Sequence, residues 1–93
     1  MKESLILQSL EEMAASINLK VSYENLRKED PALKGGLCKV KGEYQVLCDR
    51  SLTLSDKIEV LLDALKEFDW EGVYVNPYIR RLLERRKEKP STP

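Results

Sequence analysis

The strongest constraint on this chain is a leucine-rich stripe near its middle. Apolar residues recur there at intervals of three and four, which places them on one face of a helix: Leu54, Ile58, Leu61, Leu62, Leu65 and Phe68. Thr53 and Asp56 have the spacing of a helix cap at the start of this stripe. The pattern predicts an amphipathic helix over residues 54–68, which has to bury its apolar face against another element.

Two further helices are predicted from similar signals. Residues 2–17 repeat apolar side chains at helical spacing. Asn76 followed by Pro77 is typical of a helix start, because proline fits the first helical position. These features predict a first helix over residues 2–17 and a last helix over residues 77–87.

Between the first two helices the apolar spacing changes to two. Residues 19–24 alternate as in a half-buried strand, and the polar stretch 25–36 is expected to form a loop. Residues 37–48 predict a hairpin. A three-residue loop is favoured over a two-residue loop, because it keeps the apolar side chains on one face and pairs Lys39 with Glu43.

In that register the even-numbered side chains from Cys38 to Cys48 form one inward-facing apolar surface with no reactive hollow. The two cysteines then lie too far apart for a disulfide bond. The expected fold class is α+β with two layers and the order α-β-β-β-α-α. Its three-stranded, mainly antiparallel sheet is covered by the helices over 2–17 and 54–68, and residues 73–75 are expected to be extended, as a possible short additional strand.

Length and composition indicate one small globular domain. The chain has 93 residues, of which 42% are hydrophobic and 34% are charged. We expect a single domain over residues 1–88 and a flexible tail over 89–93. The start of the chain has no signal-peptide pattern and no stretch has the length of a membrane span, so a cytoplasmic location with free thiols is expected.

The absence of histidine restricts the chemistry. It excludes the Ser-His, Cys-His and His-metal constellations, and the spacing of Cys38 and Cys48 matches no metal motif. We therefore expect no catalytic residue, no metal ligand and no cofactor. An enzyme remains a third interpretation, which would depend on Cys38 as a nucleophile or on carboxylates such as Asp49 and Asp56.

The segment from Gly35 to Leu65, a hairpin followed by a leucine-rich helix, contains the residues LTLSDKIEV at positions 52–60. It resembles small uncharacterised bacterial proteins and the minimal zincin core of the ImmA/IrrE type, in which this helix begins roughly FTLAHExxH. The histidines of that family fall on Asp56 and Val60, and its glutamate falls on Lys57. The resemblance thus implies a degenerate core of similar architecture, without zinc binding or peptide hydrolysis.

Three surface features suggest partners. Acidic and basic residues balance at 16 each, but the last helix is basic and offers an alternative function as a nucleic-acid accessory through Arg80, Arg81, Arg85, Arg86 and Lys87. A loose aromatic cluster could form a partner surface through Trp70, Tyr74 and Tyr78. The paired glycines 35 and 36 either let an extended peptide or a phosphate approach the backbone, or simply let the chain turn.

The first interpretation is a non-catalytic protein-interaction module. A small core with bare strand edges and oppositely charged helices gains by burying surface against a partner. We therefore expect self-association as a homodimer, either through a sheet edge or through the acidic and basic helices.

Overall fold

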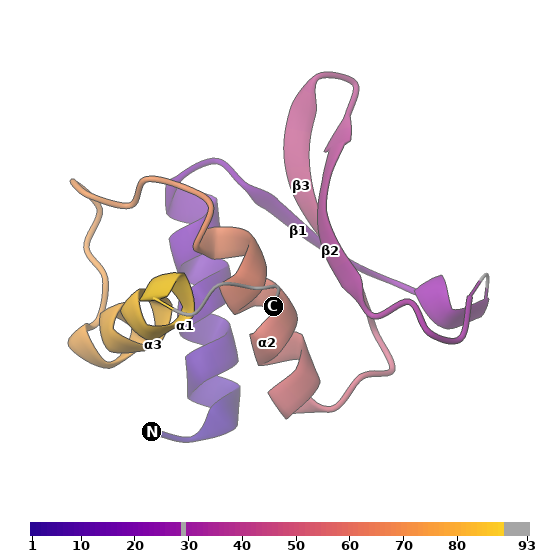
Figure 1. Cartoon of the computed structure of the whole chain (residues 1–93), viewed down its shortest axis with the longest axis horizontal. Helices are drawn as coiled ribbons and strands as arrows, with labels where there is room; N and C mark the ends of the chain where they lie inside the picture. Colours follow the sequence, from indigo (N-terminus) through magenta and orange to yellow (C-terminus); the bar gives the residue numbers. More distant parts are fainter. Residues whose placement is uncertain (29, 89–93) are drawn as a thin grey trace.

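The structure is a computed structural model that describes residues 1–28 and 30–88. Its elements are α1 (Glu3–Ser16), β1 (Lys20–Glu24), the 3₁₀ turn η1 (Leu26–Lys28), β2 (Gly35–Val40), β3 (Glu43–Asp49), α2 (Leu54–Leu65) and α3 (Pro77–Glu88). The helices gather on one side of the sheet (Figure 1). The α+β class and the element order are confirmed, and the expected tail over 89–93 lies outside the described residues.

Local capping chemistry explains where α2 and α3 begin. The Thr53 hydroxyl accepts a hydrogen bond of 3.2 Å from the backbone N–H of Asp56. The side chain of Asn76 accepts one of 2.8 Å from the backbone N–H of Tyr78. Each bond satisfies a backbone donor that has no partner inside its helix. Both helix starts are therefore where the sequence predicts them.

Two expected features differ from the structure. α2 ends at Leu65 rather than at 68, and the N–H of Phe68 donates to the carbonyl of Leu65 at 3.1 Å in the turn that follows. Residues 73–75 form no strand, because this segment lies with the helices and the side chain of Val75 is buried among them.

The sheet is mixed rather than mainly antiparallel. Its strand order is β1-β3-β2, with β1 parallel and β2 antiparallel to the central strand β3. The connection between β1 and β2 crosses the end of β3. There the N–H of Asp49 donates to the carbonyl of Lys34 at 2.8 Å, and the N–H of Arg50 donates to the carbonyl of Glu24 at 3.0 Å. A crossing at this end makes β1 run parallel to β3.

The hairpin has a two-residue loop, so the three-residue loop expected from the sequence is wrong. Val40 pairs with Glu43, and both loop residues have positive φ, 51° at Lys41 and 83° at Gly42. Two such residues form the turn type whose twist matches that of the flanking strands. The twist of the turn therefore decides the loop length, rather than the alternation of apolar residues. Compared with the register expected from the sequence, β2 is shifted by one residue along β3.

This register divides the expected apolar surface between two faces. Leu37 pairs with Val46 and shares the face beneath the helices with it, whereas Cys38 pairs with Gln45 on the opposite, uncovered face. Cys48 lies on the covered face and is fully buried. The two cysteines are therefore on opposite faces of the sheet, and both are free thiols.

The core lies between the sheet and the first two helices. α1 lies over β1, and α2 lies over β2 and β3, while α3 packs on the outer side of both helices. The largest fully buried apolar side chains come from all of these layers: Leu10, Val46, Leu61, Leu65, Ile79 and Leu83. The helical layer covers one face of the sheet only, which leaves the other face and both edge strands open.

Candidate functional site

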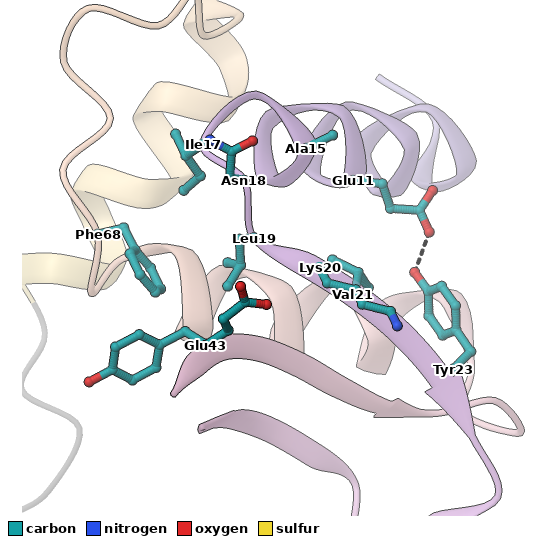
Figure 2. Close-up of a pocket in the computed structure, with 11 residues that line it drawn as sticks. Glu11, Ala15, Ile17, Asn18, Leu19, Lys20, Val21, Tyr23, Glu43 and Phe68 are labelled. Carbon is teal, nitrogen blue, oxygen red and sulfur yellow. Dashed lines mark hydrogen bonds between the residues drawn. The ribbon is translucent and has the colours of Figure 1, made fainter. Parts of the chain in front are cut away.

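Two grooves follow the free edges of the sheet. Because β3 occupies the centre, β1 and β2 each expose one edge, and a helix stands above each. The groove between β1 and α1, the β1 groove, has a volume of about 780 Å³ (Figure 2). The groove between β2 and α2, the β2 groove, has about 430 Å³. Both grooves are lined in part by the backbone of an edge strand.

The β2 groove combines a bare strand with an acidic wall. The sequence predicted that Gly35 and Gly36 belong to a loop, but the structure places both in β2. Because glycine has no side chain, the floor of the groove is backbone at these positions. Its wall carries carboxylates from α2. Two of them, Glu59 and Asp63, are paired with the guanidinium of Arg86, which is 3.3 Å from Asp63.

The β1 groove contains a polar pair that sequence reasoning missed. The hydroxyl of Tyr23 on β1 donates a hydrogen bond to the carboxylate of Glu11 on α1 (Figure 2). Burial, and then the bond to Glu11, raise the pKa of Tyr23 above its ordinary value. The phenol therefore keeps its proton at neutral pH. The two residues are 12 apart in sequence, on different elements, so no local pattern could have paired them.

The two cysteines lie in different environments. Burial raises the pKa of Cys48 to about 11, although the positive charge of Lys57 acts in the opposite direction. A buried thiol with a raised pKa is inert at neutral pH. Cys38 is half-buried on the uncovered face of β2, with Gln45 opposite it. The single apolar surface that we expected between the two cysteines is therefore not present.

The two candidate carboxylates have separate structural environments. Asp49 is fully buried at the end of β3 and accepts hydrogen bonds from the N–H of Ser51, at 3.1 Å, and from its hydroxyl. These bonds close the turn that leads toward α2. Asp56 lies in the first turn of α2, where a carboxylate complements the helix dipole. Among the described residues, no group of three or more Cys, Asp or Glu side chains is placed to hold a metal ion.

The basic helix faces its own domain in part. Arg86 is paired with the acids of α2, and the charged groups of Arg80 and Lys87 lie 5.0 Å and 4.9 Å from the ring centroid of Trp70. Arg81 and Arg85 are exposed and make no ion pair with the described residues. Three of the five cations proposed for nucleic acid thus have partners within the chain.

The aromatic residues proposed as a partner surface do not share one environment. Trp70 is buried at 6% exposure, and its indole N–H has no hydrogen-bond partner among the described residues. Tyr74 and Tyr78 are exposed, at 83% and 42%. Trp70 therefore belongs to the packing beneath α3, and only the two tyrosines are available at the surface.

No protein-family model, curated protein or solved structure matches the chain. The helices in the described part of the chain are all too short or too polar to cross a membrane.

Proposed function

We propose that this protein is a non-catalytic interaction module that forms a homodimer through the free edge of β2. The two sheets would join into one continuous sheet of six strands with all helices on the same face. The observation that carries this proposal is the alternation of unpaired backbone groups along β2. We propose the cytoplasm as its compartment, which is supported by the two free thiols.

The hairpin fixes which backbone groups of β2 are available. The residues that flank a two-residue loop form a hydrogen-bonded pair, so Val40 directs its N–H and C=O toward β3. The hydrogen bond from the N–H of Asp49 to the carbonyl of Lys34 agrees with this, because Lys34 is also even-numbered and also directs its carbonyl toward β3. The odd-numbered residues Gly35 and Leu37, together with Lys39, therefore direct their N–H and C=O groups to the free edge. These groups make no backbone bond to another described element.

These three residues favour one register for a second copy. If Leu37 lies opposite Leu37 of the partner subunit, then Gly35 lies opposite Lys39 of the partner subunit, and the reverse pair follows by symmetry. All three pairs exchange two hydrogen bonds, so the interface contains about six. A register shifted by two residues places Lys41, in the turn, opposite Gly35 and loses one pair.

The same register complements charge. Gly35 has no side chain, and the space beside it belongs to the acidic β2 groove. Lys39 of the partner subunit would extend into that space. Asp56 at its wall makes no ion pair with the described residues, whereas Glu59 is paired with Arg86, and Asp63 with both Arg86 and Lys66. Each copy supplies one lysine and receives one, which is the self-complementarity that a two-fold axis requires.

The dimer is expected to be weak. Six backbone hydrogen bonds contribute about 6 kcal/mol at roughly 1 kcal/mol each. Loss of translational and rotational freedom costs about 4 kcal/mol or more. Association is therefore expected to depend on concentration, and it has to be measured from micromolar to millimolar protein.

Light scattering across that concentration range tests the proposal. We expect the apparent mass to rise from 10.7 kDa toward twice that value. Leu37→Pro removes the N–H at the centre of the interface and leaves the bonds to β3 intact, so it should remain monomeric. Leu37→Ala loses similar packing but keeps the N–H, and it should still dimerise. Equal association of both variants, or a monomeric wild type at millimolar concentration, contradicts the proposal.

Disulfide trapping tests the register. In a Cys38→Ser background, Leu37→Cys would place two thiols on a directly opposed pair about 5.5 Å apart at Cα, which is within reach of a disulfide. In the wild-type sequence, Cys38 and its symmetry mate are offset by two residues and separated by about 8 Å, which is too far. Oxidation should therefore cross-link only the engineered pair. Rapid cross-linking through Cys38 alone would show that the register is wrong.

A further inference from the structure

The β1 groove lies at the edge of the sheet opposite the proposed dimer interface. Its walls come from the end of α1 and from β1, and Phe68 and Glu43 lie at its far end (Figure 2). Tyr44, whose ring meets that of Phe68, also lines it. At about 780 Å³ it is within the usual size range of ligand sites. The two free edges lie on opposite sides of β3. They come into contact at the hairpin, where the ammonium of Lys39 lies 5.4 Å from the ring centroid of Tyr44.

The backbone of β1 offers unpaired groups to this groove. The bond from the N–H of Arg50 to the carbonyl of Glu24 shows that even-numbered residues of β1 direct their backbone groups to β3. Val21 and Tyr23 therefore direct theirs to the free edge, and both residues line the groove. Neither makes a backbone bond to another described element. An added strand is the ligand form that satisfies such groups.

The charge of the groove indicates what that strand should carry. The carboxylate of Glu11 is half-buried and accepts a hydrogen bond from Tyr23, but it makes no ion pair with the described residues. Glu43 adds a second carboxylate at the other end, and Lys20 is the one cation of the lining. The lining is thus net negative. The ammonium of Lys57 lies 5.3 Å from the ring centroid of Tyr23 but makes no ion pair with Glu11, so this half-buried carboxylate can still pair with a lysine or arginine from outside.

The far end of the groove is aromatic. The rings of Tyr44 and Phe68 meet edge to face with their centroids 5.9 Å apart. Ile17, which follows the last residue of α1, lies across the groove from Phe68 (Figure 2). Such a surface accepts an apolar side chain. The groove therefore has an acidic end at Glu11 and an aromatic end at Phe68. An extended chain with both a basic and an apolar residue would match the two ends.

We propose that the β1 groove binds an extended basic and apolar segment of another protein, which adds to β1 as a fourth strand of the sheet. Backbone bonds to Val21 and Tyr23 would hold the segment. Glu11 would select for a basic residue, and the Tyr44–Phe68 pair would receive an apolar one. The protein is then an adaptor, with one edge for a second copy and the other edge for a partner.

Fluorescence anisotropy with defined peptides tests this proposal. The probe is a labelled extended peptide in which every second residue faces the groove, and these groove-facing positions carry valine at one end and lysine at the other. The same peptide with glutamate in place of lysine is its charge control. We expect saturable binding of the lysine peptide only. Its fully N-methylated form cannot pair with a strand and should not bind. Equal binding of the N-methylated peptide would overturn strand addition.

Matched variants locate the site. Glu11→Gln keeps an acceptor for Tyr23 but removes the charge, and it should weaken binding about tenfold. Glu12→Gln removes a charge from the next position of α1, outside the groove, and should leave the affinity unchanged. Equal weakening by both variants would reduce the interaction to general attraction between opposite charges and overturn the proposal.

The monomeric variant Leu37→Pro separates this proposal from self-association. It should bind the lysine peptide with unchanged affinity, because its β1 groove is intact. Loss of peptide binding in Leu37→Pro would place the peptide on β2 and refute the β1 assignment. If the wild type proves monomeric but the peptide results hold, only the dimer proposal fails.

Discussion

Alanine at the two adjacent glycines of β2 gives a sharp test of the hairpin register. Gly35 and Gly36 both have positive φ, 142° and 159°, so each substitution is expected to cost about 1–2 kcal/mol in backbone strain. Only Gly35 is also crowded. A Cβ added there would lie 2.3 Å from the carbonyl oxygen of Leu47 and 2.9 Å from the Cα of Cys48, whereas a Cβ at Gly36 meets nothing within 4 Å.

The crowding atoms at Gly35 belong to the backbone of the central strand, so no side-chain rotation relieves them. We expect Gly35→Ala to lose about 3 kcal/mol more than Gly36→Ala, at the upper end for overpacking. The unfolded chain is restricted equally by both alanines, so this effect cancels in the comparison. For a domain of this size the difference corresponds to roughly 12–24 °C in Tm.

Urea unfolding followed by circular dichroism, at a concentration where the chain is monomeric, measures this difference. Equal losses in the two variants would mean that Gly35 does not face the backbone of Cys48. The two-residue hairpin loop would then be wrong, and with it the set of free backbone groups from which the dimer interface is derived.

Two further predictions concern the buried ionisable groups. Iodoacetamide at pH 8 should alkylate Cys38 but not Cys48, because the latter is buried and its pKa is raised to about 11; mass spectrometry showing equal labelling in the folded state would contradict this. Burial raises the pKa of both Tyr23 and Cys48 above their ordinary values, so folding favours their protonated forms. Glu11 acts in the same direction on Tyr23 and Asp49 on Cys48, while Lys57, whose ammonium lies over the ring of Tyr23, opposes the rise at Cys48. The contribution of Tyr23 and Cys48 to the free energy of unfolding should be complete at neutral pH and decline as the pH rises from about 9 through their folded-state pKa values; urea titrations should show a smaller decline for Tyr23→Phe, and an identical decline would refute the assignment to Tyr23.

Local chemistry was the part of the fold that the sequence could predict. The caps at Thr53 and Asn76 act within three residues along the chain. The apolar stripe of α2 predicts a helix whichever element covers it, because the spacing alone defines the face. The turn after α1 is local as well, because Asn18 adopts a positive φ of 59°, a conformation that asparagine tolerates. Each of these signals lies within one helix or at its end.

The rest of the fold depends on choices that apolar alternation does not decide. Both loop lengths bury apolar residues, and the twist of the turn at Lys41 and Gly42 selects the register that places Cys38 outside the core. The parallel pairing of β1 with β3 depends on where the connection crosses. The β1 groove in turn depends on that pairing, and the bond between Glu11 and Tyr23 joins two elements whose relative position is not encoded locally.

Amide hydrogen exchange along β2 tests the central claim most directly, because it reports each backbone N–H separately. The N–H groups of Cys38 and Val40 bond to β3 and should be protected at every concentration. The N–H groups of Leu37 and Lys39 should exchange rapidly in dilute protein and become protected as the concentration rises. If Leu37 exchanges rapidly even at millimolar concentration while Cys38 stays protected, the edge of β2 is unpaired in solution and the proposed interface does not exist.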